Sequence, residues 1–469
     1  MRRFHFVAAF AVTSLASLTA TAATLEVGPG KTYAKPSDAI KAANAGDTIE
    51  IDASGTYDGD TVTWDTDNLT VRGVNGRPKI DTAAPDGGKG IFTITAANAT
   101  IENIEFSGAQ SVDSNGAGIR HQGLNLTVRG CYFHDNQDGI LGAPATNKSA
   151  TAADGQGTVL IETSEFAHNG AGDGESHNMY LNHFASFTLR YSYSHGAVEG
   201  HLVKSRAYKS FILYNRLTDE AGTEASYEID LPNGGTSYVI GNLIEQSDAG
   251  NDNIINTGEE GASNPTQVIY LVNNTIVNDH SNGTFLNVTG ATATLVNNIF
   301  KGPGTITNAS GATMSNNWDD TMGDPMLVDV ASYDYHLAAG SPCVDKGKDP
   351  GAGPDMSLDP VFEYVHPTNA EGRVVAGSAI DIGAYELGGG VPLGDGGLEV
   401  NPGGDGGASG GGGDGGNLPG DAVSPNGGSN DSGCGCVAAS RNESGFAWLA
   451  SLAVIAMTWR RRRAAKSSK

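Results

Sequence analysis

The sequence predicts an all-β protein in which short parallel strands stack, coil upon coil, into one solenoid. The first observation is a repeat of about 28 residues between residues 103 and 298, in which one small polar residue separates two apolar stretches. The repeated polar positions are Asn103, Cys131, Ser164, Ser192, Asn215, Asn242, Asn274 and Asn298. The second observation is the composition, because 66 glycines suit a turn-rich β-fold and an aromatic content of 7% favours a core of aliphatic layers.

The recurring asparagine predicts a ladder inside the solenoid. Amides at the same place in successive coils can hydrogen-bond one another at the strand spacing of about 4.8 Å. We therefore expect Asn215, Asn242, Asn274 and Asn298 to lie on one internal line. One such line requires one continuous stack of coils, so residues 24–388 are expected to form a single domain.

The N-terminal residues predict export followed by a capped solenoid. Arg2 and Arg3 precede an apolar run over residues 6–18, and small residues at 20–22 fit a cleavage site, so residues 1–23 are typical of a signal peptide. Residues 37–43 have the pattern of a short amphipathic helix, which we expect to cap the first coil.

The C-terminal residues predict a linker and a sorting tail. Residues 389–433 are rich in Gly, Pro and Asp, which is typical of a flexible linker. In residues 434–469, Cys434 and Cys436 precede a 14-residue apolar run and then four arginines. The arginines should stay cytoplasmic, and the run is short for a permanent span. We expect a transient transmembrane anchor, with a simple C-terminal membrane anchor as the alternative.

These segments resemble those of known families. The order of Cys motif, short apolar helix and Arg cluster is similar to the C-terminal sorting tail of myxobacterial surface proteins. The repeat, the capping helix and the closing segments at 341–345 and 381–386 together resemble the right-handed parallel β-helix of the pectate-lyase-like superfamily, over roughly residues 24–388. The tail implies retention at the cell surface or outer membrane, with release into the medium as the alternative.

The charge distribution excludes one class of partner and favours another. The whole chain carries a net charge of −25. Without residues 1–23 and 441–469, 19 basic and 52 acidic residues remain, a net charge of −33 that repels nucleic acid. Residues 187–217 reverse this balance with one acidic and five basic residues. The basic residues are Arg190, Lys204, Arg206, Lys209 and Arg216. We interpret the segment as an anion site, with ordinary salt bridges as the alternative.

Strand alternation arranges part of this segment into outward rows. Residues 177–182, 201–206 and 227–232 align when Met179, Val203 and Ile229 point inward, since residues two apart share a face. The row expected next to them on the outer surface is Tyr180, Lys204 and Asp230. The rows expected on either side of it are Asn178, Leu202 and Glu228, and Asn182, Arg206 and Pro232.

These residue types suit β-elimination on a glycan that contains uronic acid. A lysine near another cation can act as the base, and Arg206 can hold a carboxylate through two hydrogen bonds. Tyr180 can protonate the leaving oxygen, and Glu228 and Asp230 offer oxygen ligands for Ca²⁺. The resemblance implies the same chemistry, because lyases of this superfamily commonly use Lys or Arg as the base, often with Ca²⁺.

The histidines leave two interpretations open. His177 and His201 fall at one aligned position, so they either form a buried polar ladder or face the groove as base or substrate contacts. We expect four further residues to contact substrate. These are Arg190, His195, Asn182 and Arg216.

The resulting prediction is a monomeric polysaccharide lyase that binds an acidic polysaccharide. Three alternatives stay open on the same fold. An inverting glycoside hydrolase would use a carboxylate pair such as Glu228 and Asp230. A uronan epimerase would abstract the same proton as a lyase. A non-catalytic carbohydrate-binding surface protein or adhesin would use the same face for binding alone.

Overall fold

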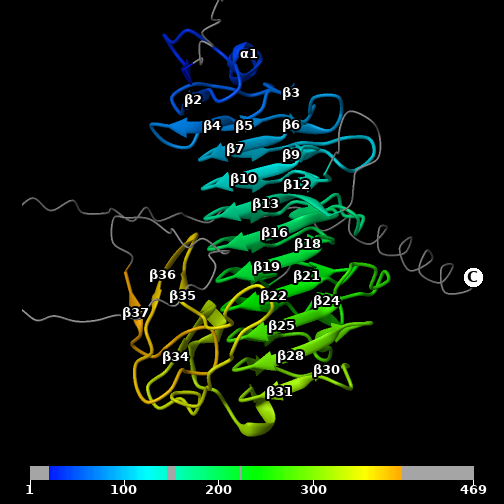
Figure 1. Cartoon of the computed structure of the whole chain (residues 1–469), viewed down its shortest axis with the longest axis vertical. Helices are drawn as coiled ribbons and strands as arrows, with labels where there is room; N and C mark the ends of the chain where they lie inside the picture. Colours follow the sequence, from blue (N-terminus) through cyan, green and yellow to red (C-terminus); the bar gives the residue numbers. More distant parts are fainter. Residues whose placement is uncertain (1–20, 145–154, 222, 393–469) are drawn as a thin grey trace, which may run out of the picture. The chain divides into compact units, whose positions relative to one another are not determined.

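The computed structural model describes residues 21–144, 155–221 and 223–392, and those up to residue 319 fold as a parallel β-helix (Figure 1). Each coil contributes one strand to each of three parallel sheets, here called sheets 1, 2 and 3. The predicted fold class is confirmed. The three strands of a coil occupy three different faces, so residues close in sequence can lie on opposite sides of the solenoid.

Sheet 1 has 12 strands. They are β1 (Thr24–Val27), β2 (Thr48–Asp52), β4 (Leu69–Val74), β7 (Asn98–Glu102), β10 (Asn125–Arg129), β13 (Gln156–Glu162), β16 (Phe184–Arg190), β19 (Lys209–Leu213), β22 (Thr236–Ile240), β25 (Val268–Val272), β28 (Thr292–Val296) and β31 (Thr313–Ser315).

Sheets 2 and 3 have ten strands each. Sheet 2 contains β3 (Val62–Trp64), β6 (Gly90–Ile94), β9 (Ala117–His121), β12 (Asp138–Gly142), β15 (Met179–Leu181), β18 (His201–Ser205), β21 (Tyr227–Leu231), β24 (Asn253–Thr257), β27 (Thr284–Val288) and β30 (Thr305–Thr307). Sheet 3 contains β5 (Lys79–Asp81), β8 (Glu105–Ser107), β11 (Tyr132–His134), β14 (Glu165–Ala167), β17 (Tyr193–His195), β20 (Arg216–Thr218), β23 (Leu243–Gln246), β26 (Thr275–Asn278), β29 (Ile299–Lys301) and β32 (Trp318–Asp319).

The predicted asparagine ladder runs through the interior at the corner between sheets 1 and 3. The side-chain amides of Asn215, Asn242 and Asn274 each donate to the next Oδ1 at 2.9–3.0 Å, ending on Asn298. The ladder continues beyond the prediction, because Asn298 donates to Asn317 at 2.9 Å. Each buried amide would cost about 1–3 kcal/mol if it were left unpaired, so the ladder fixes the register of successive coils.

The N-terminal end is closed by the expected helix, α1 (Pro36–Ala42). Proline at the first helical turn suits its fixed φ and missing N–H. Ala39 and Ile40 are fully buried against the first coils. Asp60 ties the helix start down, since the backbone N–H and hydroxyl of Ser37 donate to its carboxylate at 2.8 and 2.6 Å.

The C-terminal part of the predicted solenoid differs from the expectation. Parallel coils end at Asp319, and the residues up to 392 fold back along the side of the coils instead of adding further ones (Figure 1). They form two 3₁₀ turns, η1 (Asp320–Met322) and η2 (Val330–Ser332), an antiparallel pair, β33 (Leu327–Asp329) and β34 (Asp334–Leu337), and a small antiparallel sheet, β35 (Phe362–Val365), β36 (Asn369–Arg373) and β37 (Gly390–Val391).

Aromatic packing explains why this C-terminal segment, residues 320–392, folds back. Phe362 packs edge-on against the rings of Tyr191 and Tyr214 on the outside of the coils, at centroid distances of 5.4 and 5.6 Å. Tyr335 and Tyr385 are 1% and 5% exposed and belong to a separate apolar cluster outside the solenoid. Burial of these rings against the outside of the coils stabilises the folded-back segment.

The predicted signal peptide and tail lie almost wholly outside the described residues. Only residues 21–23 of the signal and 389–392 of the linker fall within them. Among the residues that the structure describes, no helix combines the length and the apolar character that a bilayer crossing needs.

Candidate functional site

The predicted outward row is present on sheet 2. In register, Tyr180 pairs with Lys204, and Lys204 pairs with Asp230. Met179, Val203 and Ile229 are fully buried, as the alternation requires. Parallel strands lie about 4.8 Å apart, so side chains of one row can touch their neighbours directly.

Lys204 lies at the centre of a compact set of polar groups. Its Nζ is 3.2 Å from Asp230 Oδ2, 3.5 Å from His201 Nε2 and 3.6 Å from Glu260 Oε1. It also lies 5.5 Å from the centre of the Tyr180 ring. Lys204 is only 9% exposed, so it is not the freely solvated lysine that an outward row would suggest. Burial makes each of these contacts stronger than it would be in water.

Arg206 connects the tyrosine of the row to the same acidic partner. Its Nε donates to Tyr180 Oη at 2.7 Å, and Nη1 donates to Asn233 Oδ1 at 2.5 Å. Its Nη2 is 2.5 Å from Glu260 Oε2. One carboxylate, that of Glu260, therefore bridges the two cations Lys204 and Arg206. The phenol proton of Tyr180 stays free for another acceptor, because Arg206 occupies the oxygen only as a donor.

The two carboxylates of the site differ in their titration. Burial raises the pKa of Asp230, although the charge of Lys204 opposes it. Asn256 also donates to Asp230 Oδ1, at 3.2 Å. Burial acts to raise the pKa of Glu260 too, but the hydrogen bond and charge of Arg206 outweigh it and the pKa lies below its usual value. Glu260 is thus the firmly ionised partner, and Asp230 is the one able to accept a proton.

The histidines resolve the open alternative in part. The rings of His177 and His201 stack at 4.5 Å, and Tyr227 stacks on His201 at 5.0 Å. His201 Nε2 is 3.4 Å from Asp230 Oδ2, so this ladder lies on the side of the Lys204 row rather than in the core. Burial holds the pKa of both imidazoles well below its usual value. Both rings are therefore neutral and buried, with His201 touching the reactive groups.

One predicted outward row is wrong. Asn178, Leu202 and Glu228 are all fully buried. The strict alternation fails at the start of the strands, where Leu202 and Val203 both point into the core. The carboxylate of Glu228 has neither oxygen hydrogen-bonded, and burial raises its pKa well above the usual value. Glu228 is fully enclosed, with burial favouring its protonated form.

The residues present do not fit the expected Ca²⁺ site. Ca²⁺ needs several oxygen ligands that converge on one point. Glu228 is enclosed in the interior, whereas the Asp230 carboxylate is engaged by Lys204 and Asn256. Over the described ranges, no group of three or more His, Cys, Asp or Glu side chains is arranged to hold a metal ion.

The basic segment 187–217 is distributed over all three sheets. Arg190 lies on sheet 1 in an ion pair of 2.6 Å with Glu162, and Lys209 on the same sheet pairs with Asp355. His195 and Arg216 lie on sheet 3. Only Lys204 and Arg206 belong to the site on sheet 2. The predicted substrate contacts Arg190, His195 and Arg216 therefore lie on other sheets than Lys204, because one coil visits every face.

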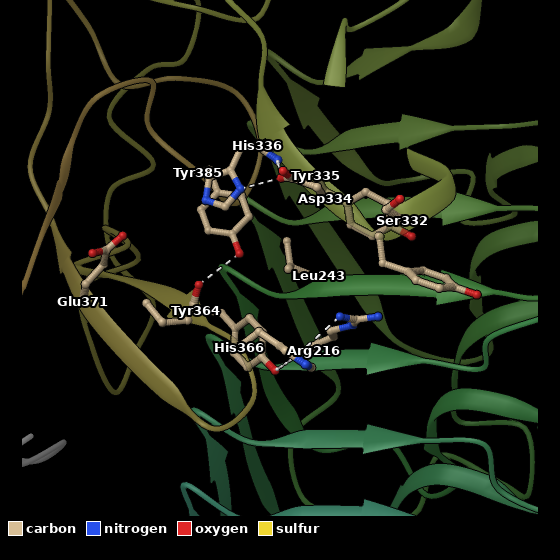
Figure 2. Close-up of a pocket in the computed structure, with 12 residues that line it drawn as sticks. Arg216, Leu243, Ser332, Asp334, Tyr335, His336, Tyr364, His366, Glu371 and Tyr385 are labelled. Carbon is tan, nitrogen blue, oxygen red and sulfur yellow. Dashed lines mark hydrogen bonds and ion pairs between the residues drawn. The ribbon is translucent and has the colours of Figure 1, made fainter. Parts of the chain in front are cut away.

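Arg216 lines a second cavity, of about 350 Å³, under the C-terminal segment (Figure 2). Its guanidinium carbon lies 4.9 Å from the ring centres of both Tyr193 and Tyr333, and its Nη2 is 3.3 Å from Glu220 Oε1. His195 lies nearby, 3.3 Å from Glu165 Oε1. Burial alone would lower the pKa of His195, but the hydrogen bonds to Glu165 and Glu220 outweigh it and raise the pKa. This Arg216 cavity is separate from the site on sheet 2.

The predicted contact Asn182 does lie beside the site. It lines a cavity of about 270 Å³ together with Tyr180, Asp138 and Arg120. Sequence reasoning missed Arg120, Asp138 and Glu260. Arg120 carried a signal, because it occupies the outward parity of strand 117–121, in register with the row of Tyr180. Glu260 follows a strand in a loop, where no periodicity could place it.

The comparisons with known proteins agree with this fold. Residues 49–244 match the family model described as the right handed beta helix region. No curated protein matches the chain. A solved structure of pectate lyase Pel9A is 17% identical with a TM-score of 0.51, covering 78% of this chain and 97% of that chain. An alginate lyase from Paenibacillus sp. str. FPU-7 is 13% identical with a TM-score of 0.37, covering 63% and 99%. The described residues between 24 and 319 thus form a right-handed parallel β-helix, similar in fold to pectate lyase Pel9A.

Proposed function

We propose that the protein is a polysaccharide lyase that cleaves a glycan containing uronic acid by β-elimination on sheet 2. The observation that carries the proposal is the carboxylate of Glu260 held between Lys204 Nζ and Arg206 Nη2, at 3.6 and 2.5 Å. A substrate uronate brings a carboxylate of the same size and charge, and it can take this position when the exposed Glu260 side chain turns outward. The similarity in fold to a pectate lyase supports the choice of acidic glycans as substrate.

The base in this proposal is the amine of Lys204. Its ammonium proton can pass to Asp230, which is 3.2 Å away and has a pKa raised by burial. The free amine then removes the proton on the carbon next to the substrate carboxylate. Neutralisation of that carboxylate by Arg206 stabilises the negative charge that develops there. His201, neutral and 3.5 Å from Nζ, orients the amine.

The leaving oxygen takes its proton from Tyr180. The pair of electrons from the broken C–H bond forms the new C=C bond, and the bond to the leaving oxygen breaks. Arg206 Nε donates to Tyr180 Oη at 2.7 Å, so it stabilises the oxygen as the phenol gives up its proton. The product then carries an unsaturated sugar at its new non-reducing end.

The test uses the full chain and a panel of polygalacturonate, alginate and glucuronate-containing polymers. Ultraviolet absorbance reports the unsaturated product, and reducing ends without that absorbance would identify a hydrolase instead. The pair that suggested a hydrolase, Glu228 and Asp230, has lost its support because Glu228 is buried. Inversion at the proton-bearing carbon without chain cleavage would identify a uronan epimerase.

A carbohydrate-binding surface protein is the second candidate function. It is favoured by the finding that both cations of the site already have carboxylate partners in the described structure. Binding needs only exchange of Glu260 for a substrate carboxylate, whereas elimination also needs Lys204 to lose its proton. Retention of an acidic polymer in affinity electrophoresis without unsaturated product would select this function.

We also propose that the protein is exported and held at the cell surface by residues 434–469. The proposal rests on the order of cysteines, apolar run and arginines in the sequence, which lies outside the described residues. Deletion of 434–469 should release the β-helix into the medium, as immunoblots of cells and medium would show. Retention of the truncated protein on the cells would contradict the role of the tail.

A further inference from the structure

The outward row of sheet 2 continues past Tyr180 to a second cation. Tyr180 pairs in register with Leu141 on β12, and Leu141 pairs with Arg120 on β9. Arg120 and Lys204 therefore stand three strands apart on the same face, about 14 Å at the usual strand spacing. The row runs along the axis of the solenoid, across strands that are held in register.

Arg120 lacks the anion that normally accompanies a buried guanidinium. Its Nε and Nη1 atoms are buried and have no hydrogen-bond partner within the described residues. Such unpaired charged donors are costly. The carboxylate that acts on its charge is Asp138, which accepts a hydrogen bond from the backbone N–H of His177 at 2.9 Å. Burial raises the pKa of Asp138 to about 7, so near neutral pH it is only a partial counter-charge.

A cavity of about 270 Å³ connects Arg120 with the Lys204 site, since Arg120, Tyr180 and Asn182 all line it. Its other charged lining groups are Asp113, Asp138, Asp173 and Glu175. Asp173 is engaged by the backbone N–H of Glu175 at 2.9 Å, and Asp113 lies 3.9 Å from Lys89 Nζ. Sugar hydroxyls are the donors that such carboxylates can accept from. A uronic acid residue offers both complements: hydroxyl donors for the acidic lining and one carboxylate for Arg120.

We propose that Arg120 binds a second carboxylate of the same glycan, about three sugar residues from the one held at Lys204. One pyranose of an extended glycan is about as long as the spacing of roughly 4.8 Å between neighbouring strands, so a chain lying along the row presents carboxylates to both cations. The substrate class is then a continuous run of uronates rather than a polymer with isolated ones. The glycan identity of the ligand rests on the proposed function, whereas the anion site rests on Arg120 itself.

The experiment compares oligogalacturonates and oligomannuronates from dimer to hexamer on the full chain. Wild type, Arg120→Gln and Arg120→Lys are measured by calorimetry and by steady-state cleavage. Arg72→Gln serves as the control, because Arg72 is an exposed arginine on sheet 1 paired with Glu50. For wild type we expect affinity to rise once the chain reaches about four residues. Arg120→Gln should abolish that rise, weakening hexamer binding about 10- to 100-fold while leaving dimer binding unchanged.

Arg120→Lys should restore part of the gain, because it keeps the charge and loses the planar fork. Equal weakening of dimer and hexamer in Arg120→Gln, together with a lower melting temperature, would make Arg120 structural and overturn the subsite. If Arg120→Gln still cleaves the polymer and its affinity rises with oligosaccharide length as in wild type, the subsite is overturned and the lyase proposal stands. Failure of wild type to bind either series would overturn both.

Discussion

On sheet 2, Lys204 and Arg206 share the carboxylate of Glu260, whose side chain is 48% exposed. On sheet 3, the guanidinium of Arg216 lies 4.9 Å from the ring centres of both Tyr193 and Tyr333 and lines the cavity under the C-terminal segment. Both places contain cations, a tyrosine, a histidine and carboxylates. They differ in what covers them: a single flexible acidic side chain in the first case, and a packed segment of about 70 residues in the second.

The comparison teaches that residue chemistry alone does not separate a site from packing on a β-helix. Tyr364 and Tyr385, which line the same cavity as Arg216, are fixed within the fold and are 2% and 5% exposed. The Arg216 cavity is walled by these rings, so a change at Arg216 acts on the packing that holds the C-terminal segment. On sheet 2, displacement of Glu260 breaks two ion pairs, with Lys204 and Arg206, but the Glu260 side chain is 48% exposed and a substrate carboxylate can replace it in both pairs. The two regions should therefore respond to mutation in opposite ways.

The largest expected effect is that of Lys204→Met on turnover. Loss of the general base should lower kcat by about 10²-fold or more. The substitution also leaves Asp230 without its cation in a buried position, so the melting temperature should fall. Progress curves at saturating uronate polymer check the first effect, and thermal unfolding checks the second.

The double variant Lys204→Met with Asp230→Asn separates the two effects. It removes both charges, so stability should recover relative to Lys204→Met while turnover stays lost. Recovery of turnover along with stability would show that Lys204 acts only by pairing with Asp230.

Tyr180→Phe should lower kcat by about 10- to 100-fold, because the leaving oxygen loses its proton donor. KM should change little, since Arg206 retains Asn233 and Glu260 as partners. A substrate with a better leaving group, such as an aryl uronide, should be affected less. Equal losses on both substrates would assign the proton transfer to another group.

Arg216→Ala on sheet 3 should have the opposite effect to a change on sheet 2: it should lower stability and leave turnover unchanged. It removes the ion pair with Glu220 and two ring contacts in a nearly buried setting, and we expect about 3 kcal/mol less unfolding free energy. Turnover per folded molecule should be unchanged. Denaturant unfolding and kcat measured on the same preparation check both statements. A fall in kcat with normal stability would move the active surface to sheet 3.

A buried carboxyl group on sheet 3, that of Glu245, should make stability depend on pH. Burial raises the pKa of Glu245 to about 8, whereas in the unfolded chain it is about 4.3. The folded state therefore keeps a proton that the unfolded state has lost. This contribution to stability is complete below about pH 4.3 and disappears as the pH rises through about 8. Glu245→Gln should flatten the loss of unfolding free energy over that range, and an unchanged slope would assign it to other groups.

The sequence predicts which residues form the outward row on sheet 2 better than it predicts the residues that surround the row. The inward set Met179, Val203 and Ile229 correctly predicted which face Tyr180, Lys204 and Asp230 occupy, because alternation is local. The alternation fails near the start of these strands, where the consecutive residues Leu202 and Val203 both point into the core. Glu228, in register with Leu202, is buried as well.

The sequence could not predict which basic residues share a face, and the reason is topological. Arg190, Lys204 and Arg216 are close in sequence, yet a coil of this length passes through all three sheets and puts one of them on each. Arg120 is far away in sequence and belongs to the same row as Lys204. The return of residues 320–392 along the outside also depends on aromatic contacts between distant segments, such as Phe362 with Tyr191, which no repeat encodes.

The smallest expected effect is that of Glu260→Gln, and it tests the basis of the comparison. Glu260 occupies the position between Lys204 and Arg206 that a substrate carboxylate should take, so removing its charge should lower KM by a few fold and leave kcat nearly unchanged. The matched control is Glu259→Gln, since Glu259 is the adjacent exposed glutamate and accepts from Asn256 at 2.7 Å instead of bridging the cations. When KM is measured at one temperature and rising salt concentration, the difference in KM between wild type and Glu260→Gln should become smaller, because salt screens an exposed carboxylate. A higher KM in Glu260→Gln than in the control would mean that Glu260 holds the two cations in place for substrate. In that case Glu260 would hold the cations of sheet 2 in place, just as the C-terminal segment holds Arg216 in place on sheet 3.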